Sequence, residues 1–253
     1  WCCLVGSEMC IRDRYVPITI FNSDGNEVDA CGNGSRCIIK LLPLIDSKSK
    51  EEYEKNSKKN ISLKTKNRIL TGSLSDKSKV LLDMGNPIFD WNKIPLSKKI
   101  DPGNVDIEID GEKISFGFCV NVGNPHIIFF NVFNENFDKF YRQLENFGPK
   151  IENYKLFPEK VNVTFARIVN KEHIVVRVWE RGAGLTKACG TAACATAVAA
   201  NKLKLVKNAV TIDFHDNLKG EREGLFISIE PEPVNKIFMI GHAGGPSKIE
   251  LEV

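Results

Sequence analysis

Two short segments of the chain resemble each other, and each places a Cys-Gly pair directly before a stretch with helical character. The first segment is ACGNGS at residues 30–35, and the second is ACGTAA at residues 188–193. Cys31 therefore lies in the first half of the chain and Cys189 in the second. Paired motifs of this kind predict an internal duplication of architecture, in which each half supplies one cysteine.

A cysteine at a helix start is suited to proton transfer. A free thiol is mostly protonated at neutral pH, because its ordinary pKa is about 8.5, but the N–H groups at a helix N-terminus favour the thiolate. One such cysteine can take the α-proton from one face of an amino acid while the other returns a proton to the opposite face, which inverts that carbon. A lone Ala-Cys-Gly is commonly a buried structural element. Two copies, each before a helix, favour Cys31 and Cys189 as an acid–base pair.

The glycines after the cysteines suit an anionic intermediate. Gly32 and Gly190 have no side chain, so backbone N–H groups at the two helix starts can approach an α-carboxylate closely. Because such donors can stabilise the developing charge, we expect neither pyridoxal phosphate nor a metal ion in the site.

The overall composition is that of an ordinary globular protein. Of 253 residues, 42% are hydrophobic and 26% are charged, and the 35 basic and 32 acidic residues leave a formal net charge of +3. This near-balance gives no reason to expect nucleic-acid binding, and no apolar run approaches the ~18 residues of a membrane span. The basic segment at residues 48–68 is interleaved with acidic and polar residues, which indicates a solvated helix and loop.

The eight cysteines do not follow a disulfide or zinc pattern. Neither the pair Cys31 and Cys37 nor the pair Cys189 and Cys194 forms a C-x-x-C motif. We expect Cys37, Cys119 and Cys194 to be small buried apolar residues. The histidines, at positions 126, 173, 215 and 242, are too scattered to be zinc ligands. This cysteine usage is typical of a reducing cytoplasm.

Hydrophobic periodicity predicts the order of the elements. Helices are expected at residues 33–45, 136–147 and 191–203. The first of these has Pro43 in its last turn, where proline is unfavourable, and an expected apolar stripe of Cys37, Leu41, Leu42 and Ile45. Strands are expected at 15–21 before a turn at 22–26, in a meander at 61–84, in a hairpin around Asp110-Gly111, and at 118–122, 127–130, 161–169, 173–180, 210–214, 225–229 and 237–240. This order predicts an α+β fold of two similar lobes with a cleft between them.

Polar residues at turns and strand ends are suited to hold the polar ends of an amino acid. Asn22, Asn162 and the GNPH sequence at 123–126 are such groups, although an isolated Gly-Asn-Pro is more often only a turn. Arg181 can pair with a carboxylate in bidentate fashion, and Glu180 can accept an ammonium group. A structural ion pair is the alternative for Glu180 and Arg181.

At these motifs the chain resembles the diaminopimelate epimerase family, cofactor-independent isomerases of lysine and peptidoglycan-precursor synthesis. The resemblance runs in order from about residue 15 to the C-terminus. It rests on FNSDGNEV at 21–28, CGNGSRC at 31–37, MGNP at 84–87, GNPH at 123–126, ERGAG at 180–184 and ACGTAAC at 188–194.

The resemblance implies a reaction and a set of site residues. Cys31 and Cys189 would be the acid–base cysteines, and His126 and Glu180 would be important for activity. The implied substrate contacts are Asn22, Gly32, Asn33, Asn124, Asn162, Glu180, Arg181, Gly190 and Thr191. The implied reaction interconverts LL- and meso-2,6-diaminopimelate without a cofactor, in the cytoplasm, in a protein that is commonly a homodimer.

The resemblance also implies a fold and a departure from it. Each pseudo-symmetric lobe would be a strand-rich, barrel-like sheet around a central helix, with an N-terminal lobe at 15–117, a returning strand within 243–253 and a C-terminal lobe at 118–242. The family opens with a strand, a Gly-Asn-Asp-Phe-like motif, a helix and a second strand, none of which precedes Tyr15 here. Residues 1–14 show neither a strand nor a helix period and are not a secretory signal. We therefore expect them to be unmatched, and the chain to be a fragment with impaired activity.

Three alternatives remain open. A proline racemase or hydroxyproline epimerase shares the two-lobe, two-thiol design, although the ERGAG and GNPH motifs favour diaminopimelate, whose distal end needs extra polar partners. A cysteine hydrolase would use Cys31 or Cys189 with His126 and would need only one thiol. A non-enzymatic binding module would bind an amino acid without exchanging its α-proton.

Overall fold

The computed structural model describes residues 3–4, 15–21, 27–28, 31–66, 68–76, 78–130, 137–214 and 224–244. The chain divides into two compact units, one formed by Trp1–Asp83 with Ile240–Val253 and the other by Met84–Met239. The predicted α+β class is confirmed, because strands dominate and each unit has a helix that begins at a cysteine motif. The units part after Asp83 rather than near residue 117, because β8 (Val105–Ile109) pairs with β9 (Glu112–Asn121) and β9 pairs with β10 (Pro125–Phe130) of the second unit.

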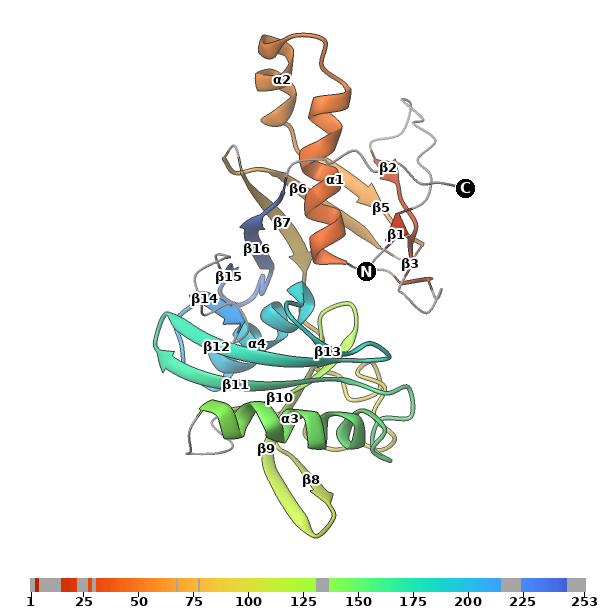
Figure 1. Ribbon diagram of the computed structural model, residues 1–253, viewed down its shortest axis with the longest axis vertical. Helices are drawn as coiled ribbons and strands as arrows, with labels where there is room; N and C mark the ends of the chain where they lie inside the picture. The colour runs from red at the N-terminus through yellow and green to blue at the C-terminus, as the bar shows by residue number, and fades with distance from the viewer. Residues whose placement is uncertain are drawn as a thin grey trace. The chain divides into compact units, whose positions relative to one another are not determined.

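Helix α1 (Gly32–Ile45) organises the first unit and packs against strand β6 and the short helix α2 (Lys50–Ser57) (Figure 1). Its close approach to β6 depends on Gly72. A Cβ atom there would lie 2.6 Å from the Leu81 carbonyl oxygen and 2.6 Å from Ile39 Cδ1. The strands that begin in this unit are β1 (Cys3–Leu4), β2 (Val16–Pro17), β3 (Ile20–Phe21), β4 (Glu27–Val28), β5 (Ile61–Lys64), β6 (Ile69–Leu74) and β7 (Lys79–Gly85).

The predicted meander is confirmed, since β5, β6 and β7 pair antiparallel in sequence order. Strand β2 adds to β5 in parallel, and β16 (Ile237–His242) lies beside β7. The single strand predicted at 15–21 is wrong, because it divides into β2 and β3. Pro17 has no N–H group to continue a ladder, and β3 instead joins β1 and β4 in a separate antiparallel sheet. The predicted turn at 22–26 lies outside the described residues.

The buried face of α1 differs from the predicted apolar stripe. Its buried residues are Gly32, Ser35, Arg36, Ile39 and Pro43. Cys37 is exposed rather than buried, and Ile45 is 64% exposed. Pro43 does not end the helix, which continues to Ile45 with the proline ring buried. The contact with Gly72 orients Ile39 toward β6, and this tertiary contact sets the face that the apolar pattern alone misplaced.

The second unit contains a mixed sheet in the order β15, β14, β12, β11, β10, β9, β8, with β13 also paired to β12. The pairs β10–β11 and β12–β14 are parallel. The predicted hairpin of β8 and β9 is confirmed, and its turn residues Asp110 and Gly111 have φ values of 54° and 81°, as a type I′ turn requires. The elements are β8 (Val105–Ile109), β9 (Glu112–Asn121), β10 (Pro125–Phe130), α3 (Phe137–Glu152), β11 (Asn162–Asn170), β12 (His173–Glu180), β13 (Gly184–Thr186), α4 (Gly190–Lys202), β14 (Ala209–Phe214) and β15 (Leu225–Ile229).

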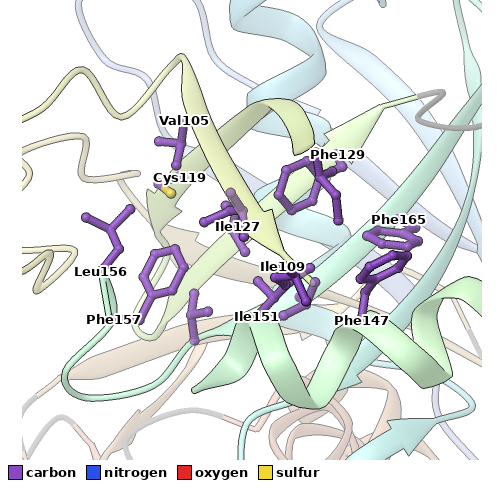
Figure 2. Close-up of a cluster of buried hydrophobic side chains, with 14 of the residues drawn as sticks. Val105, Ile109, Cys119, Ile127, Phe129, Phe147, Ile151, Leu156, Phe157 and Phe165 are labelled. Carbon is purple, nitrogen blue, oxygen red and sulfur yellow. The ribbon is translucent and has the colours of Figure 1, made fainter. Parts of the chain in front are cut away.

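A hydrophobic cluster joins α3 to β8, β9, β10 and β11 (Figure 2). Phe147 and Ile151 of α3 lie among side chains of the strands, and Phe129 meets Phe165 edge to face at a centroid distance of 5.9 Å. Since Ile151 is fully buried here, α3 extends through Gly148-Pro149 to Glu152. The predicted end at residue 147 is therefore wrong.

Helix α4 is the central helix of the second unit. It packs against β9, β10, β11, β14 and β15, and every residue from Gly190 to Ala200 is buried. Small side chains permit this close packing, since most of the buried residues are alanine. In the part of the chain that the structure describes, no helix combines the length and the apolar character needed to cross a bilayer.

Candidate active site

Cys31 is the N-cap residue of α1, where the sequence predicted a helix start. Its backbone is extended, with φ −137° and ψ 103°, and its Sγ accepts a hydrogen bond from the Gly34 N–H group at 3.4 Å. The side chain is half-buried. The sulfur therefore replaces the usual capping oxygen and meets the unpaired N–H groups of the first helical turn.

Asn33 is the second residue of α1, and Arg36 orients its side chain. The guanidinium Nη2 donates to Asn33 Oδ1 at 2.6 Å, and Nε donates to the His242 carbonyl at 3.3 Å. Arg36 is only 6% exposed, whereas Asn33 is exposed. The amide oxygen of Asn33 already accepts a hydrogen bond from Arg36, so the NH₂ group of Asn33 remains available to donate to a ligand. Sequence reasoning missed Arg36, although it lies within the CGNGSRC motif.

In the second unit, the strand register brings predicted site residues together. His126 of β10 is paired with Asn162 of β11. The Asn162 side chain donates to the Pro125 carbonyl at 2.8 Å and accepts from the Arg181 N–H group at 3.0 Å. Asn162 thus links the start of β10 to the end of β12, and its amide is bonded to backbone on both sides.

Cys189 is the N-cap residue of α4, with φ −138° and ψ 115°, close to the values for Cys31. It is buried, and its Sγ lies 3.4 Å from Thr191 Oγ1. Burial raises the pKa of the Cys189 thiol well above its ordinary value, and so do the negative charge and hydrogen bond of Glu180. The Thr191 hydroxyl and the Ala192 N–H group lower this pKa by less. The expected preference for a thiolate at this helix start is thus reversed, and Cys189 is a protonated thiol at neutral pH.

His126 is fully buried and neutral. Burial and the positive charge of Arg181 lower the pKa of His126 to about 3. Its Nε2 lies 2.8 Å from Asn124 Oδ1, which can only accept, so this nitrogen carries the proton. Within the described part of the chain, Nδ1 has no hydrogen-bond partner. In this geometry His126 orients Asn124 and leaves the NH₂ group of Asn124 available. Its importance for activity stays a prediction.

The predicted residues thus form one group in each unit. Cys31, Gly32 and Asn33 lie at the start of α1. Contacts among strand ends and the start of α4 join the second group: Asn124, His126, Asn162, Glu180, Arg181, Cys189, Gly190 and Thr191. Asn22 lies outside the described residues, as does most of the range 243–253 in which a returning strand was expected. Of that range, Ala243 and Gly244 are described, and they form no strand.

Sequence reasoning also missed Glu152, whose side chain lies against the turn that carries Glu180 and Arg181. An acidic residue at the end of a helix is the signal that could have found it, because the helix dipole disfavours a negative charge there. That signal was hidden by the predicted helix end at residue 147.

Comparison of the coordinates with solved structures defines the class of fold. The probable proline racemase from Agrobacterium radiobacter K84 superimposes with a TM-score of 0.64 over 99% of this chain and 76% of that chain, at 13% sequence identity. At this identity the likeness shows the fold alone. The chain therefore has the α+β fold found in this class of racemase.

Sequence comparison identifies the family. Residues 118–243 match the sequence model of diaminopimelate epimerase. The diaminopimelate epimerase of Pelagibacter ubique (strain HTCC1062) is 50% identical over 200 residues, which cover 78% of this chain and 68% of that protein. The enzyme of the same name from Bradyrhizobium sp. (strain BTAi1 / ATCC BAA-1182) is 41% identical over 214 residues, covering 82% of this chain and 66% of the relative. The chain belongs to the diaminopimelate epimerase family, and it spans about two thirds of the length of these relatives.

Proposed function

We propose that the chain acts as an amino-acid epimerase that interconverts LL- and meso-2,6-diaminopimelate by proton transfer between Cys31, the substrate and Cys189. The observation that carries the proposal is the shared N-cap position and backbone conformation of the two cysteines, although only the Cys31 sulfur also accepts a capping hydrogen bond. Each is the N-cap of a helix that begins Cys-Gly, with nearly equal backbone angles, and the two lie in different units. Membership of the diaminopimelate epimerase family supports the choice of substrate.

The proposed reaction needs no external oxidant, because one proton leaves the α-carbon and another returns to it. The Cys31 sulfur, as thiolate, takes the α-proton, so that a C–H bond breaks and an S–H bond forms. The Cys189 thiol, as acid, then gives its proton to the opposite face of the same carbon, which inverts it. The proposal requires the two sulfurs to face one α-carbon from opposite sides. The protonated state of Cys189 supports its role as the donor in this direction.

Other groups have proposed roles in binding and charge stabilisation. Glu180 accepts the thiol hydrogen bond of Cys189. When the reaction runs in the other direction, the Cys189 thiolate takes the α-proton and the Cys31 thiol gives its proton to the opposite face. The first N–H groups of α1 and α4, at Gly32 and Gly190, would bind the α-carboxylate as charge develops on it. The NH₂ groups of Asn33 and Asn124 and the guanidinium of Arg181 would bind the remaining polar ends of the substrate.

The test is epimerisation of LL-diaminopimelate in heavy water, with deuterium incorporation at the α-carbon followed by mass spectrometry. Wild type should form the meso isomer with one solvent deuterium. Cys31→Ala and Cys189→Ala should each lower kcat/KM by about a thousand-fold, since a positioned acid or base contributes about 10²–10⁴ in rate.

The chain offers a matched control for each variant. Cys37→Ala lies in the same helix as Cys31 on an exposed face, and Cys194→Ala lies in the same helix as Cys189. Both should retain activity within a few-fold of wild type. Turnover that survives the loss of either Cys31 or Cys189 would point to a one-thiol hydrolase. Binding of diaminopimelate without deuterium uptake would point to a binding module. Racemisation of proline in place of diaminopimelate would point to a different substrate class.

We also propose a homodimer in a reducing cytoplasm. Free thiols at positions 31, 37, 119, 189 and 194 suit such a compartment. Light scattering should give twice the chain mass of 28.3 kDa, and a monomer at micromolar concentration would contradict the dimer.

A further inference from the structure

Glu152 is a buried acidic residue in an unfavourable position. It is the last residue of α3 and is 4% exposed. A carboxylate at a helix C-terminus faces the negative end of the helix dipole, and burial removes the water that would stabilise it. Contacts within the protein must therefore compensate for this placement.

Three donors meet the Glu152 carboxylate. The Trp179 indole Nε1–H donates to Oε2 at 2.7 Å, and the Gly182 N–H group donates to Oε1 at 3.0 Å. The Lys160 ammonium lies 3.7 Å from Oε1. Two of the three partners flank Glu180 and Arg181 in the sequence, so the carboxylate clamps the segment that carries these two residues.

The clamped segment is a tight turn. The Ala183 N–H group donates to the Glu180 carbonyl at 3.1 Å, and Gly182 has φ 76°, as the third residue of a type II turn requires. Type I and type II turns differ by a flip of the central peptide, which here joins Arg181 to Gly182. The bond from Gly182 N–H to Glu152 fixes the orientation of that peptide.

Arg181 is consequently held from both sides. The peptide before it donates its N–H group to Asn162 Oδ1, and the peptide after it donates to Glu152 Oε1. Its guanidinium Nη1 also donates to the Glu159 carbonyl at 3.0 Å. The orientations of the two peptide planes define φ and ψ of Arg181. The Asn162 and Glu152 side chains therefore fix the direction in which the Arg181 side chain leaves the backbone.

Close packing holds the other anchor of the carboxylate in place. A Cβ atom at Gly148 of α3 would lie 2.7 Å from the Trp179 ring, and one at Gly184 would lie 3.6 Å from it. The end of α3 is fixed as well, because Asn153 Nδ2 donates to the Pro149 carbonyl at 2.8 Å. The indole therefore lies between α3 and the turn, with little room to move.

We propose that Glu152 is a positioning residue that presents Glu180 and Arg181 to the substrate by fixing the Arg181–Gly182 peptide and the Trp179 indole. The proposal rests on the proposed function for its effect on turnover. Its structural part, the fixed turn, stands apart from any activity.

The first experiment replaces Glu152 with glutamine. Glu152→Gln keeps the side-chain shape but places an NH₂ group opposite either the Gly182 or the Trp179 donor, so one of the two hydrogen bonds is lost. The other then has a neutral acceptor in place of a carboxylate, so the hydrogen bond of the Gly182 N–H group is weakened in either case. We expect KM for diaminopimelate to rise about ten-fold, by a larger factor than kcat falls, since the loss of one hydrogen bond to a charged group changes an equilibrium by roughly ten-fold or more. Hydrogen exchange at the Gly182 amide should accelerate at least ten-fold, as followed by NMR.

Glu159→Gln is the matched control, because it makes the same charge change beside the same turn with an exposed side chain. It should leave KM and exchange within two-fold of wild type. Where Glu152→Gln fails to fold, Glu152→Asp, which keeps the charge but shortens the reach, should give the same changes. Unchanged KM together with unchanged exchange at Gly182 would overturn the proposal, whatever the melting temperature. A wild type without epimerase activity would end the proposed function, while the exchange rates would still decide the role of Glu152.

Discussion

The surroundings of Cys189 outweigh the general effect of a helix N-terminus on a thiol. A helix start favours the thiolate, and the Thr191 hydroxyl and Ala192 N–H group act in that direction. Burial and the Glu180 carboxylate act against it and raise the pKa of the thiol. Sequence alone could place Cys189 at the helix start but could not give this balance, because Glu180 reaches the sulfur only through the fold of the β12–β13 turn.

This balance predicts opposite effects of two substitutions at one thiol. Glu180→Gln removes the negative charge, so the pKa of Cys189 should fall and its alkylation should begin at lower pH. Thr191→Val removes a hydroxyl that stabilises the thiolate, so the pKa should rise and alkylation should begin at higher pH. The measurement is the rate of iodoacetamide labelling of the Cys189 peptide against pH. Shifts of the same sign in both variants would refute this account of the thiol.

At the scale of elements, features that depend on neighbouring residues were predicted correctly, whereas features that depend on tertiary contacts were not. The two helix starts at cysteine and the hairpin at Asp110-Gly111 follow from short-range chemistry, and both predictions are confirmed. The buried face of α1 and the end of α3 were predicted wrongly, because Gly72 and the buried Ile151 determine them through contacts with distant strands. Periodicity shows that a helix has an apolar face, but not which neighbour selects it.

The packing of α1 on β6 gives a prediction at this scale. In Gly72→Ala the new methyl group would meet the Leu81 carbonyl oxygen at 2.6 Å, and a backbone atom cannot turn away as a side chain can. We expect the free energy of unfolding to fall by about 1–3 kcal/mol, the usual range for overpacking. Gly103→Ala is the control, because its nearest neighbour is the Asp101 side chain at 3.3 Å. Urea denaturation measures both, and equal midpoints would show that β6 does not pack this closely against Ile39 of α1 and the Leu81 carbonyl of β7.

At the scale of the whole molecule, the two groups of site residues differ in how far sequence could predict them. The first group, Cys31 to Asn33, is contiguous, so the motif itself assembles it. The second group comes from four separate segments that the β10–β11 register and the β12 turn bring together. Local chemistry pointed to Cys189, Glu180 and Arg181 one at a time, but only the family resemblance joined them into one site, since spacing along the chain contains no information on strand register. Glu152 and Arg36 entered neither group, because each acts on a neighbouring group: Arg36 bonds the Asn33 amide, and Glu152 bonds the Gly182 N–H group.

The proposed convergence of two thiols on one carbon predicts sensitivity to oxidation. A disulfide needs the two sulfurs to approach to about 2 Å, which an empty shared site would allow and a bound substrate would prevent. Mild oxidant should therefore abolish activity and join the Cys31 and Cys189 peptides in a mass map, reductant should restore activity, and diaminopimelate should protect. Cys37→Ala should oxidise as wild type does, because that thiol lies on the exposed face of α1. Inactivation that leaves Cys31 and Cys189 unlinked, or an enzyme untouched by oxidant, would show that the two sulfurs do not share a site, and the proton-transfer proposal would fail with it.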